Sequence, residues 1–162
     1  MEEPDRRLII IRRVSTPFTV RTVEWLEQRE ALRAVRYTVF VQEQKVPEEM
    51  EWDEADGAAR HVLAVAENGT PIGTGRLSQD CRIGRMAVLA PWRKRGVGQA
   101  ILRALLEIAR ERGCGVVVLH AQTHALGFYA CSGFSAVGAE FEEAGIAHRV
   151  MKRSLDSEAR PS

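Results

Sequence analysis

The chain has little cysteine and no long apolar run. It contains three cysteines, Cys81, Cys114 and Cys131, an odd number without a C-x-x-C pair. A disulfide framework is therefore not expected, and a reducing compartment fits this usage. No apolar run reaches the roughly 20 residues of a membrane-spanning helix. The charged start MEEPDRR also lacks the apolar stretch of a secretory signal. These absences predict a cytoplasmic protein without a membrane partner.

The chain also lacks an excess of charge of either sign. The formal net charge is +1, so nothing in the overall balance attracts nucleic acid or an anionic membrane. Hydrophobic residues make up 45% and charged residues 28% of the 162 residues, which is typical of one globular domain with a packed core. We expect this domain over 18–153, after an arm or extra strand over 1–17 and before a polar tail over 154–162.

Hydrophobic periodicity and turn signals predict an α+β domain. The turn signal Asn68-Gly69 predicts a hairpin, and the nearly continuous apolar run GVVVLHA predicts a buried, parallel strand. The expected strands are 18–24, 60–67, 72–77, 81–88, 115–121 and 147–153, and the expected helices are 26–40, 96–112 and a short one within THALGFYACSGF. The order predicts antiparallel strands followed by one parallel crossover.

An acidic loop is expected over 42–57, between the first helix and the hairpin. Six carboxylates lie between positions 48 and 56: Glu48, Glu49, Glu51, Asp53, Glu54 and Asp56. Such a run is usually a solvated face. The alternative is that these carboxylates attract a cationic amine through their local field.

The turn RKRGVG, at the start of the second long helix, is the most informative stretch. A helix N-terminus leaves backbone N–H groups unpaired and carries partial positive charge. Gly96 and Gly98 allow an anion to approach these groups, and Arg93, Lys94 and Arg95 add three cations. The turn therefore predicts a phosphate or pyrophosphate site, or else a tightly packed helix start with a solvated basic patch.

Two familiar phosphate sites do not fit this turn. A P-loop needs Gly-Lys-Ser/Thr, whereas Gln99 follows Gly98 here. A dinucleotide fingerprint needs a third glycine where Ile101 stands, and an acidic residue at the end of the next strand, which VVVLHAQ lacks. The remaining pattern is R-x-x-G-x-G, a coenzyme A turn.

With this turn after RMAV and AQTHALGFYACSGF farther along, the chain resembles the GNAT superfamily of acetyl-CoA-dependent N-acyltransferases. It is similar to the branch of ElaA-like and YjcF-like proteins. Six segments carry that narrower resemblance, in family order: VRYTVFVQEQKVP, ADGAARHVLAV, GTGRL, IGRMAV, AQTHALGFY and EEAGIAHRVM. The resemblance covers roughly residues 18–152.

The resemblance implies a GNAT fold and a set of cofactor contacts. The mostly antiparallel sheet would part between two parallel strands, 81–88 and 115–121, with the pantetheine arm on the backbone of the earlier strand. Tyr129 matches the family's tyrosine that protonates the departing thiolate, and Gln122 stands where an Asn is usual. The implied cofactor-binding residues are Met86, Ala87, Val88, Arg93, Lys94, Arg95, Gly96, Val97, Gly98, Gln99, Gln122 and Tyr129.

Acetyl transfer to an amine needs a base, an oxyanion donor and an acid. A lysine-like amine has a pKa of about 10.4, so its deprotonation at pH 7 costs about 4–5 kcal/mol. The backbone N–H of Val88 is the expected oxyanion donor, and Tyr129 is the expected acid unless it is only a core tyrosine.

The base does not follow from the resemblance. Many relatives carry a glutamate where this chain has Gly84, and no carboxylate lies on 81–88. Glu43 and His148 are the expected replacements, ahead of His61 and His120. A water relay without a single base is the other route.

The sequence thus predicts an acetyl-CoA-dependent N-acetyltransferase acting by direct transfer in a ternary complex. The acceptor is a primary amine on a small molecule or a protein, and a homodimer is expected. A metal site is not expected, because His120 and His124 lie on different elements, and Cys114 and Cys131 are expected to be buried. The alternatives are a non-catalytic coenzyme A sensor or interaction module, favoured by the missing strand carboxylate, and a nucleotide-binding protein.

Overall fold

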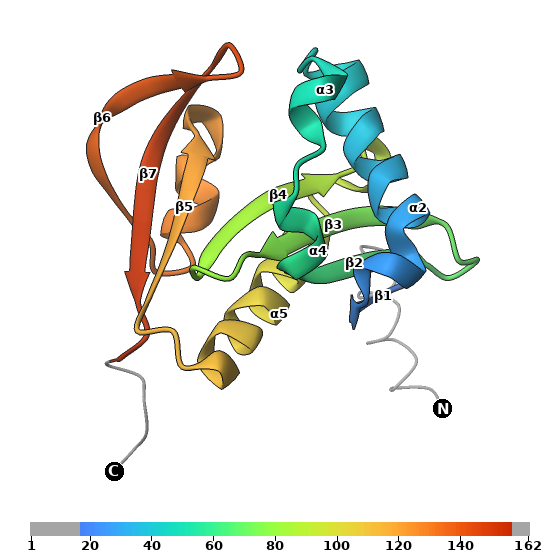
Figure 1. Cartoon of the computed structure of the whole chain (residues 1–162), viewed down its shortest axis with the longest axis horizontal. Coiled ribbons are helices and arrows are strands. Elements are labelled where there is room, and N and C mark those ends of the chain that lie inside the picture. Colours follow the sequence, from blue (N-terminus) through green and yellow to red (C-terminus); the bar gives the residue numbers. More distant parts are fainter. Residues whose placement is uncertain (1–16, 157–162) are drawn as a thin grey trace, which may run out of the picture.

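The computed structural model describes residues 17–156, which form one mixed sheet with helices on both faces (Figure 1). The strands follow the order β1-β2-β3-β4-β5-β7-β6. They are β1 (Phe18–Val23), β2 (Arg60–Ala66), β3 (Pro71–Leu77), β4 (Arg82–Val88), β5 (Val116–Gln122), β6 (Ser135–Glu143) and β7 (Ile146–Ser154). The longer helices are α2 (Trp25–Arg36) and α5 (Val97–Arg112), and the short ones are η1 (Tyr37–Glu43), α3 (Glu48–Glu51), α4 (Ala55–Ala58), η2 (Ala90–Trp92), η3 (Thr123–Ala125) and α6 (Leu126–Ala130).

The sheet consists of two antiparallel parts joined by one parallel contact. Strands β1 to β4 pair antiparallel in sequence order, and β7 lies antiparallel between β5 and β6. The parallel pair β4–β5 joins these parts, through the crossover helix α5. The predicted α+β class, with a mostly antiparallel sheet that contains one parallel crossover, is confirmed.

Helices α2 and α5 both pack on β3, which is buried along nearly its whole length. Small residues on β3 allow the backbone of α5 to come close. A Cβ added to Gly73 or Gly75 would lie 2.8 or 2.7 Å from side-chain atoms of Ile101. These glycines therefore set the distance between β3 and α5, the helix whose N-terminus carries the basic turn.

The helix predicted over 26–40 is two different helices. Helix α2 ends at Arg36 and continues directly into η1, a π-helix whose seven residues end at Glu43. Val35, Val39 and Phe40 keep the chain buried through the junction. A hydrophobic pattern cannot distinguish the two helix types, because the wider turn changes the direction of only a few side chains. The expected loop after them contains α3 and α4.

The sequence reasoning missed β6. Its segment, SAVGAEFEE, is largely exposed at the edge of the sheet and is irregular between Val137 and Phe141. An edge strand with one exposed face and a bulge does not give a regular alternation of apolar and polar residues.

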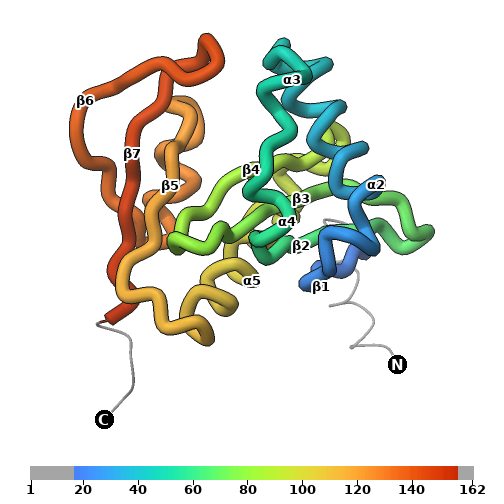
Figure 2. Tube along the Cα trace, in the orientation of Figure 1, coloured from blue at the N-terminus to red at the C-terminus, as the bar shows by residue number. Residues whose placement is uncertain are grey.

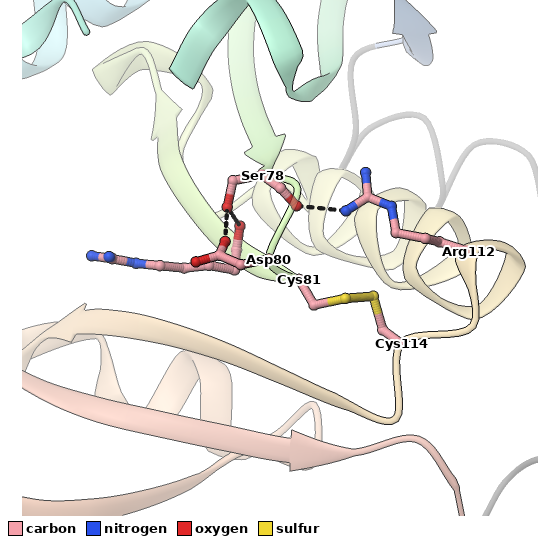
Figure 3. Close-up of a disulfide and its surroundings, with 6 residues drawn as sticks. Ser78, Asp80, Cys81, Arg112 and Cys114 are labelled. Carbon is pink, nitrogen blue, oxygen red and sulfur yellow. Dashed lines mark hydrogen bonds between the residues drawn. A yellow bond between two sulfur atoms is a disulfide. The ribbon is translucent and has the colours of Figure 1, made fainter. Parts of the chain in front are cut away.

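The cysteines contradict two of the predictions. Cys81, directly before β4, and Cys114, two residues before β5, form a disulfide with a Cα–Cα distance of 6.1 Å (Figure 3). The residues are 33 positions apart in sequence, but the crossover brings the starts of the two parallel strands together. Nearby, Arg112 donates a hydrogen bond to the carbonyl of Ser78 (2.5 Å). Because the chain forms this disulfide, its cysteines do not support the expected reducing compartment. The second correction concerns Cys131, which was expected to be buried and is exposed.

The described strands begin at Phe18 and end at Ser154. The arm or extra strand predicted over 1–17 falls, except for its last residue, outside the described residues. Strand β7 continues through Ser154, and the buried Leu155 bonds through its N–H to Gly115, so ordered chain extends into the segment expected to be tail. No helix among residues 17–156 is long and apolar enough to cross a membrane.

Candidate active site

Strands β4 and β5 pair at their starts and then part. Within the described chain their parallel pairing covers only Arg82 with Val118 and Ile83 with Leu119. Beyond that point the strands diverge, as the trace in Figure 2 shows. The separation coincides with a bulge, where two residues of β4 lie opposite one residue of β3, and Arg85 has a φ of 51°.

The backbone of Val88 faces the gap between β4 and β5. Val88 lies opposite Gly73, and the next residue, Leu89, donates its N–H to Ile72 (2.9 Å). In an antiparallel pair this pattern directs the N–H and C=O of Val88 away from β3 and toward β5. Strand alternation gives Met86 the same direction. Peptide groups at both residues therefore border the gap.

The basic turn lies at the open end of β4 and leads into α5. Gly96 is the N-cap, with a φ of 89°, and Lys94 has a φ of 63°. Among the described residues no side chain caps this helix start, and the first helical bond in the turn runs from Ala100 to Gly96. The free N–H groups and the dipole of a 16-residue helix form a site that suits a phosphate group.

Helix α6 packs against the start of α5. A Cβ added to Gly98 would lie 3.4 Å from the ring of Phe128 and 3.8 Å from Val88. The next residue, Tyr129, is buried and contacts Phe128 and Phe134 edge-on. Burial raises the pKa of Tyr129 to about 12. The phenol is therefore protonated at neutral pH and retains a proton to donate.

Gln122, the last residue of β5, belongs to a small network of polar side chains. Its amide nitrogen donates to Gln44 (3.0 Å), and Nε2 of His124 lies 2.8 Å from its amide oxygen. Gln44 follows η1 directly, so this contact connects the π-helix with the end of β5. Sequence reasoning missed Gln44 because nothing in its local pattern shows which strand it meets.

Glu43 and His148, the two expected bases, have different environments. Both oxygens of Glu43 accept hydrogen bonds from Arg93 (2.7 Å each), and these bonds hold the pKa of Glu43 below its usual range. A carboxylate with a lowered pKa is a weaker base. His148 lies opposite Gln122 on β7, and its Nδ1 donates to the carbonyl of Ile146 (2.7 Å). Its Nε2 is therefore the nitrogen with the free lone pair.

The other two histidines considered as bases, His61 and His120, have different contacts. Nε2 of His61 lies 2.8 Å from the carbonyl of Asp56, and its ring stacks on Trp25. Burial lowers the pKa of His61. Nδ1 of His120 lies 2.8 Å from both Arg82 and Glu143. Neither set of contacts leaves the ring as ready to accept a proton as Nε2 of His148.

The solvated face expected for the acidic loop is found for four of its six carboxylates, Glu48, Glu49, Asp53 and Glu54, which are exposed. Glu51 and Asp56 are buried at 3% and 2% exposure, and Asp53 is partly exposed. They pair with three arginines from α2, β3 and β4 to form a buried charge cluster: Arg36, Glu51, Asp53, Asp56, Arg76 and Arg85. These carboxylates neutralise arginines, so Asp53 and Asp56 do not supply a free field for a cationic acceptor.

The position of the missing strand carboxylate is open. A Cβ added to Gly84 would meet no atom within 4 Å, so no neighbouring atom crowds the first carbon of a side chain at this position. In residues 17–156 no group of three or more His, Cys, Asp or Glu side chains is arranged to hold a metal ion.

Comparisons with known proteins agree with this geometry. The family model described as an acetyltransferase (GNAT) domain matches residues 26–155. YjcF of Bacillus subtilis (strain 168), described as an uncharacterized N-acetyltransferase, is 37% identical over 131 residues, 78% of this chain and 93% of that protein. ElaA of Escherichia coli (strain K12) is 33% identical over 138 residues, 80% of this chain and 90% of that protein. The crystal structure of an acyl-CoA N-acyltransferase from Pseudomonas aeruginosa is 28% identical with a TM-score of 0.75, and the match covers 85% of this chain and 100% of that one.

Proposed function

Because this chain belongs to the GNAT family of acetyltransferases, in the branch that includes YjcF and ElaA, we propose that it moves an acetyl group from acetyl-CoA to a primary amine. Transfer is direct, within a complex that holds both substrates. The observation that carries the proposal is the parting of β4 from β5 beside the uncapped start of α5. The acceptor is an amine of a small molecule or a protein.

The residues around the gap fit the thioester end and the diphosphate of coenzyme A. The N–H groups of Lys94 to Gln99 receive the diphosphate, with Gly96 and Gly98 leaving room for it. Peptide groups of Met86 bond the pantetheine arm, as a further strand would, and the N–H of Val88 faces the acyl oxygen. Ala87 separates them, and Gln122 gives a polar contact at the end of β5.

Three groups of this chain carry the proton and charge transfers. Acetyl-CoA supplies an activated acyl group with a good leaving sulfur. The N–H of Val88 stabilises the negative charge that develops on the acyl oxygen. Nε2 of His148 accepts the amine's proton, directly or through a water, and the hydroxyl of Tyr129 donates a proton to the departing sulfur. We favour His148 over Glu43 because the Arg93 bonds reduce the basicity of Glu43.

Replacing His148 by Gln tests the assignment of the base. We expect kcat at pH 7 to fall by about 10²-fold. The loss should narrow toward pH 10, because a lysine-like amine with a pKa of about 10.4 then loses its proton without help. The measurement is a pH profile of kcat for wild type, His148→Gln and the control His120→Gln. An equal loss in His120→Gln, or a full rate in His148→Gln, would remove His148 from the mechanism.

Release of free coenzyme A thiol from acetyl-CoA tests the proposed function itself. The full chain is assayed against a panel of small primary amines and lysine peptides, with mass spectrometry of the products. We expect thiol release in step with an added acetyl group on an amine nitrogen. Binding of acetyl-CoA without turnover on any amine would instead support the non-catalytic sensor.

A further inference from the structure

The end of π-helix η1 connects the basic turn that follows β4 with the end of β5. Glu43, its last residue, binds Arg93 at the start of the basic turn, and the following Gln44 binds Gln122 at the end of β5. π-Helical turns are rare and frequently lie at functional sites. The wider turn of η1 thus presents two consecutive side chains to opposite sides of the gap.

The guanidinium of Arg93 is directed toward β4 and η1. Its Nη1 and Nη2 each donate to one oxygen of Glu43 (2.7 Å), and its Nε donates to the carbonyl of Val88 (2.8 Å). This two-pronged pairing fixes the plane of the guanidinium, which a single contact would leave free. The arginine that opens R-x-x-G-x-G therefore bonds the same residue whose N–H we assign to the acyl oxygen.

The pair is not built for stability. The side chains of Arg93 and Glu43 are 39% and 43% exposed, and exposed ion pairs contribute little to the stability of a fold. The contact matters because it orients the peptide groups of Val88. The C=O and N–H of Val88 point to the same side of the strand, so a fixed carbonyl also limits the rotation of the N–H.

We propose that Glu43 and Arg93 form a positioning pair that holds the backbone of Val88 for catalysis. Glu43 orients Arg93, and Arg93 holds the carbonyl of Val88, so that the N–H of Val88 faces the acyl oxygen. Glu43 is then not the base, and the side chain of Arg93 is not a ligand of the diphosphate. The inference rests on the proposed function, since it assigns a role in the same reaction.

Four variants and a matched control test the pair: Glu43→Gln, Arg93→Gln, Arg93→Lys, the double variant Glu43→Gln/Arg93→Gln, and Glu49→Gln as an exposed glutamate nearby. We expect each single variant to lower kcat by about tenfold, because small misplacements of a transition-state donor are costly. The double variant should lose no more than either single one, since both act through one contact. Arg93→Lys should not retain the wild-type kcat, because lysine cannot donate two parallel hydrogen bonds to a carboxylate as a guanidinium does. Glu49→Gln should match the wild type.

Two further readouts separate positioning from the other roles. The dissociation constant for coenzyme A should change by less than about threefold in every variant, because the backbone amides of the turn are intact. The shape of the pH profile of kcat should also stay unchanged. If the fall of kcat at low pH disappears in Glu43→Gln, Glu43 is the base. Binding weakened more than about tenfold in Arg93→Gln, with kcat retained, would make Arg93 a diphosphate ligand. If the kcat losses of the two single variants multiply in the double variant, Glu43 and Arg93 do not act through one contact, and the proposal is wrong.

Amide hydrogen exchange of the free protein tests the pair without turnover. Leu89, whose N–H bonds Ile72, directly follows the carbonyl that Arg93 holds. We expect faster exchange at residues 86–89 in both Glu43→Gln and Arg93→Gln, by about the same factor, and not in Glu49→Gln. Unchanged exchange would contradict the positioning role even if the enzyme is active. If no amine supports turnover, the proposed function fails while this readout still decides on the pair.

Discussion

Replacing Tyr129 by Phe lowers kcat by about 10²–10³-fold while the affinity for coenzyme A stays within about threefold of wild type. The hydroxyl is the group lost, and its role is to protonate the departing sulfur. Because burial raises the pKa of Tyr129 to about 12, the phenol stays protonated across the working pH range. The measurement is thiol release at saturating acetyl-CoA, together with the dissociation constant for coenzyme A by calorimetry.

The chain offers a matched control for this variant. Tyr37 is the other of its two tyrosines, and it is 37% exposed on η1. Tyr37→Phe should leave kcat unchanged. If Tyr129→Phe also keeps full turnover, then Tyr129 is only a core tyrosine, and another donor protonates the sulfur.

Replacing Arg36 by Met destabilises the fold by about 3–5 kcal/mol. Arg36 is 1% exposed and pairs with Glu51 and Asp56, each with an atom at 2.9 Å. Without the guanidinium both carboxylates stay buried with one partner fewer, which costs more than the pair itself contributes. The measurement is the free energy of unfolding from urea titration at pH 7.

A neighbouring arginine and a change of pH separate this effect from a general loss of packing. Arg33, one turn earlier, is exposed and lies 4.7 Å from the centre of the same Trp52 ring that Arg36 contacts at 5.3 Å. Arg33→Met should cost less than about 1 kcal/mol. A similar loss in both variants would contradict the role of the buried charge cluster.

The pH dependence follows from Asp56. Burial raises the pKa of Asp56, but the hydrogen bonds and charges of Arg36 and Arg76 outweigh burial and hold it below its ordinary value of 3.8. A carboxyl with a lowered folded pKa contributes stability above its unfolded pKa, and this contribution is lost as the pH falls through the folded value. The difference between wild type and Arg36→Met should therefore shrink below about pH 4. An unchanged difference at pH 3 would mean that the cost is one of packing alone.

Much of the fold follows from local pattern. Asn68-Gly69 fixes a hairpin turn, and Gly113 ends α5 with a φ of 88°. The apolar run before His120 is a strand as predicted, but it is buried on one face only, and Val116 is exposed. Each signal acts within a few residues, which is why sequence reasoning could use it. By contrast, β6 carries no such signal, because an exposed edge strand with a bulge has no regular period.

The features that depend on distant contacts were not predictable. Cys81 and Cys114 look unpaired until the crossover aligns the starts of β4 and β5. The carboxylates of Glu51 and Asp56 look solvated until α2, β3 and β4 bring their arginines to them. Likewise, Glu43 is a plausible base in sequence, and only its contact with Arg93 gives it a different environment.

Titration of acetyl-CoA into ¹⁵N-labelled protein, followed through the backbone amide resonances, tests the central claim most directly. The account predicts large shifts for the amides of residues 94–99, Met86 and Val88, and small shifts on the far strands β1 and β2. Changes that bypass both the start of α5 and the gap beside β4 would contradict it, as would the absence of any change at acetyl-CoA concentrations in the millimolar range.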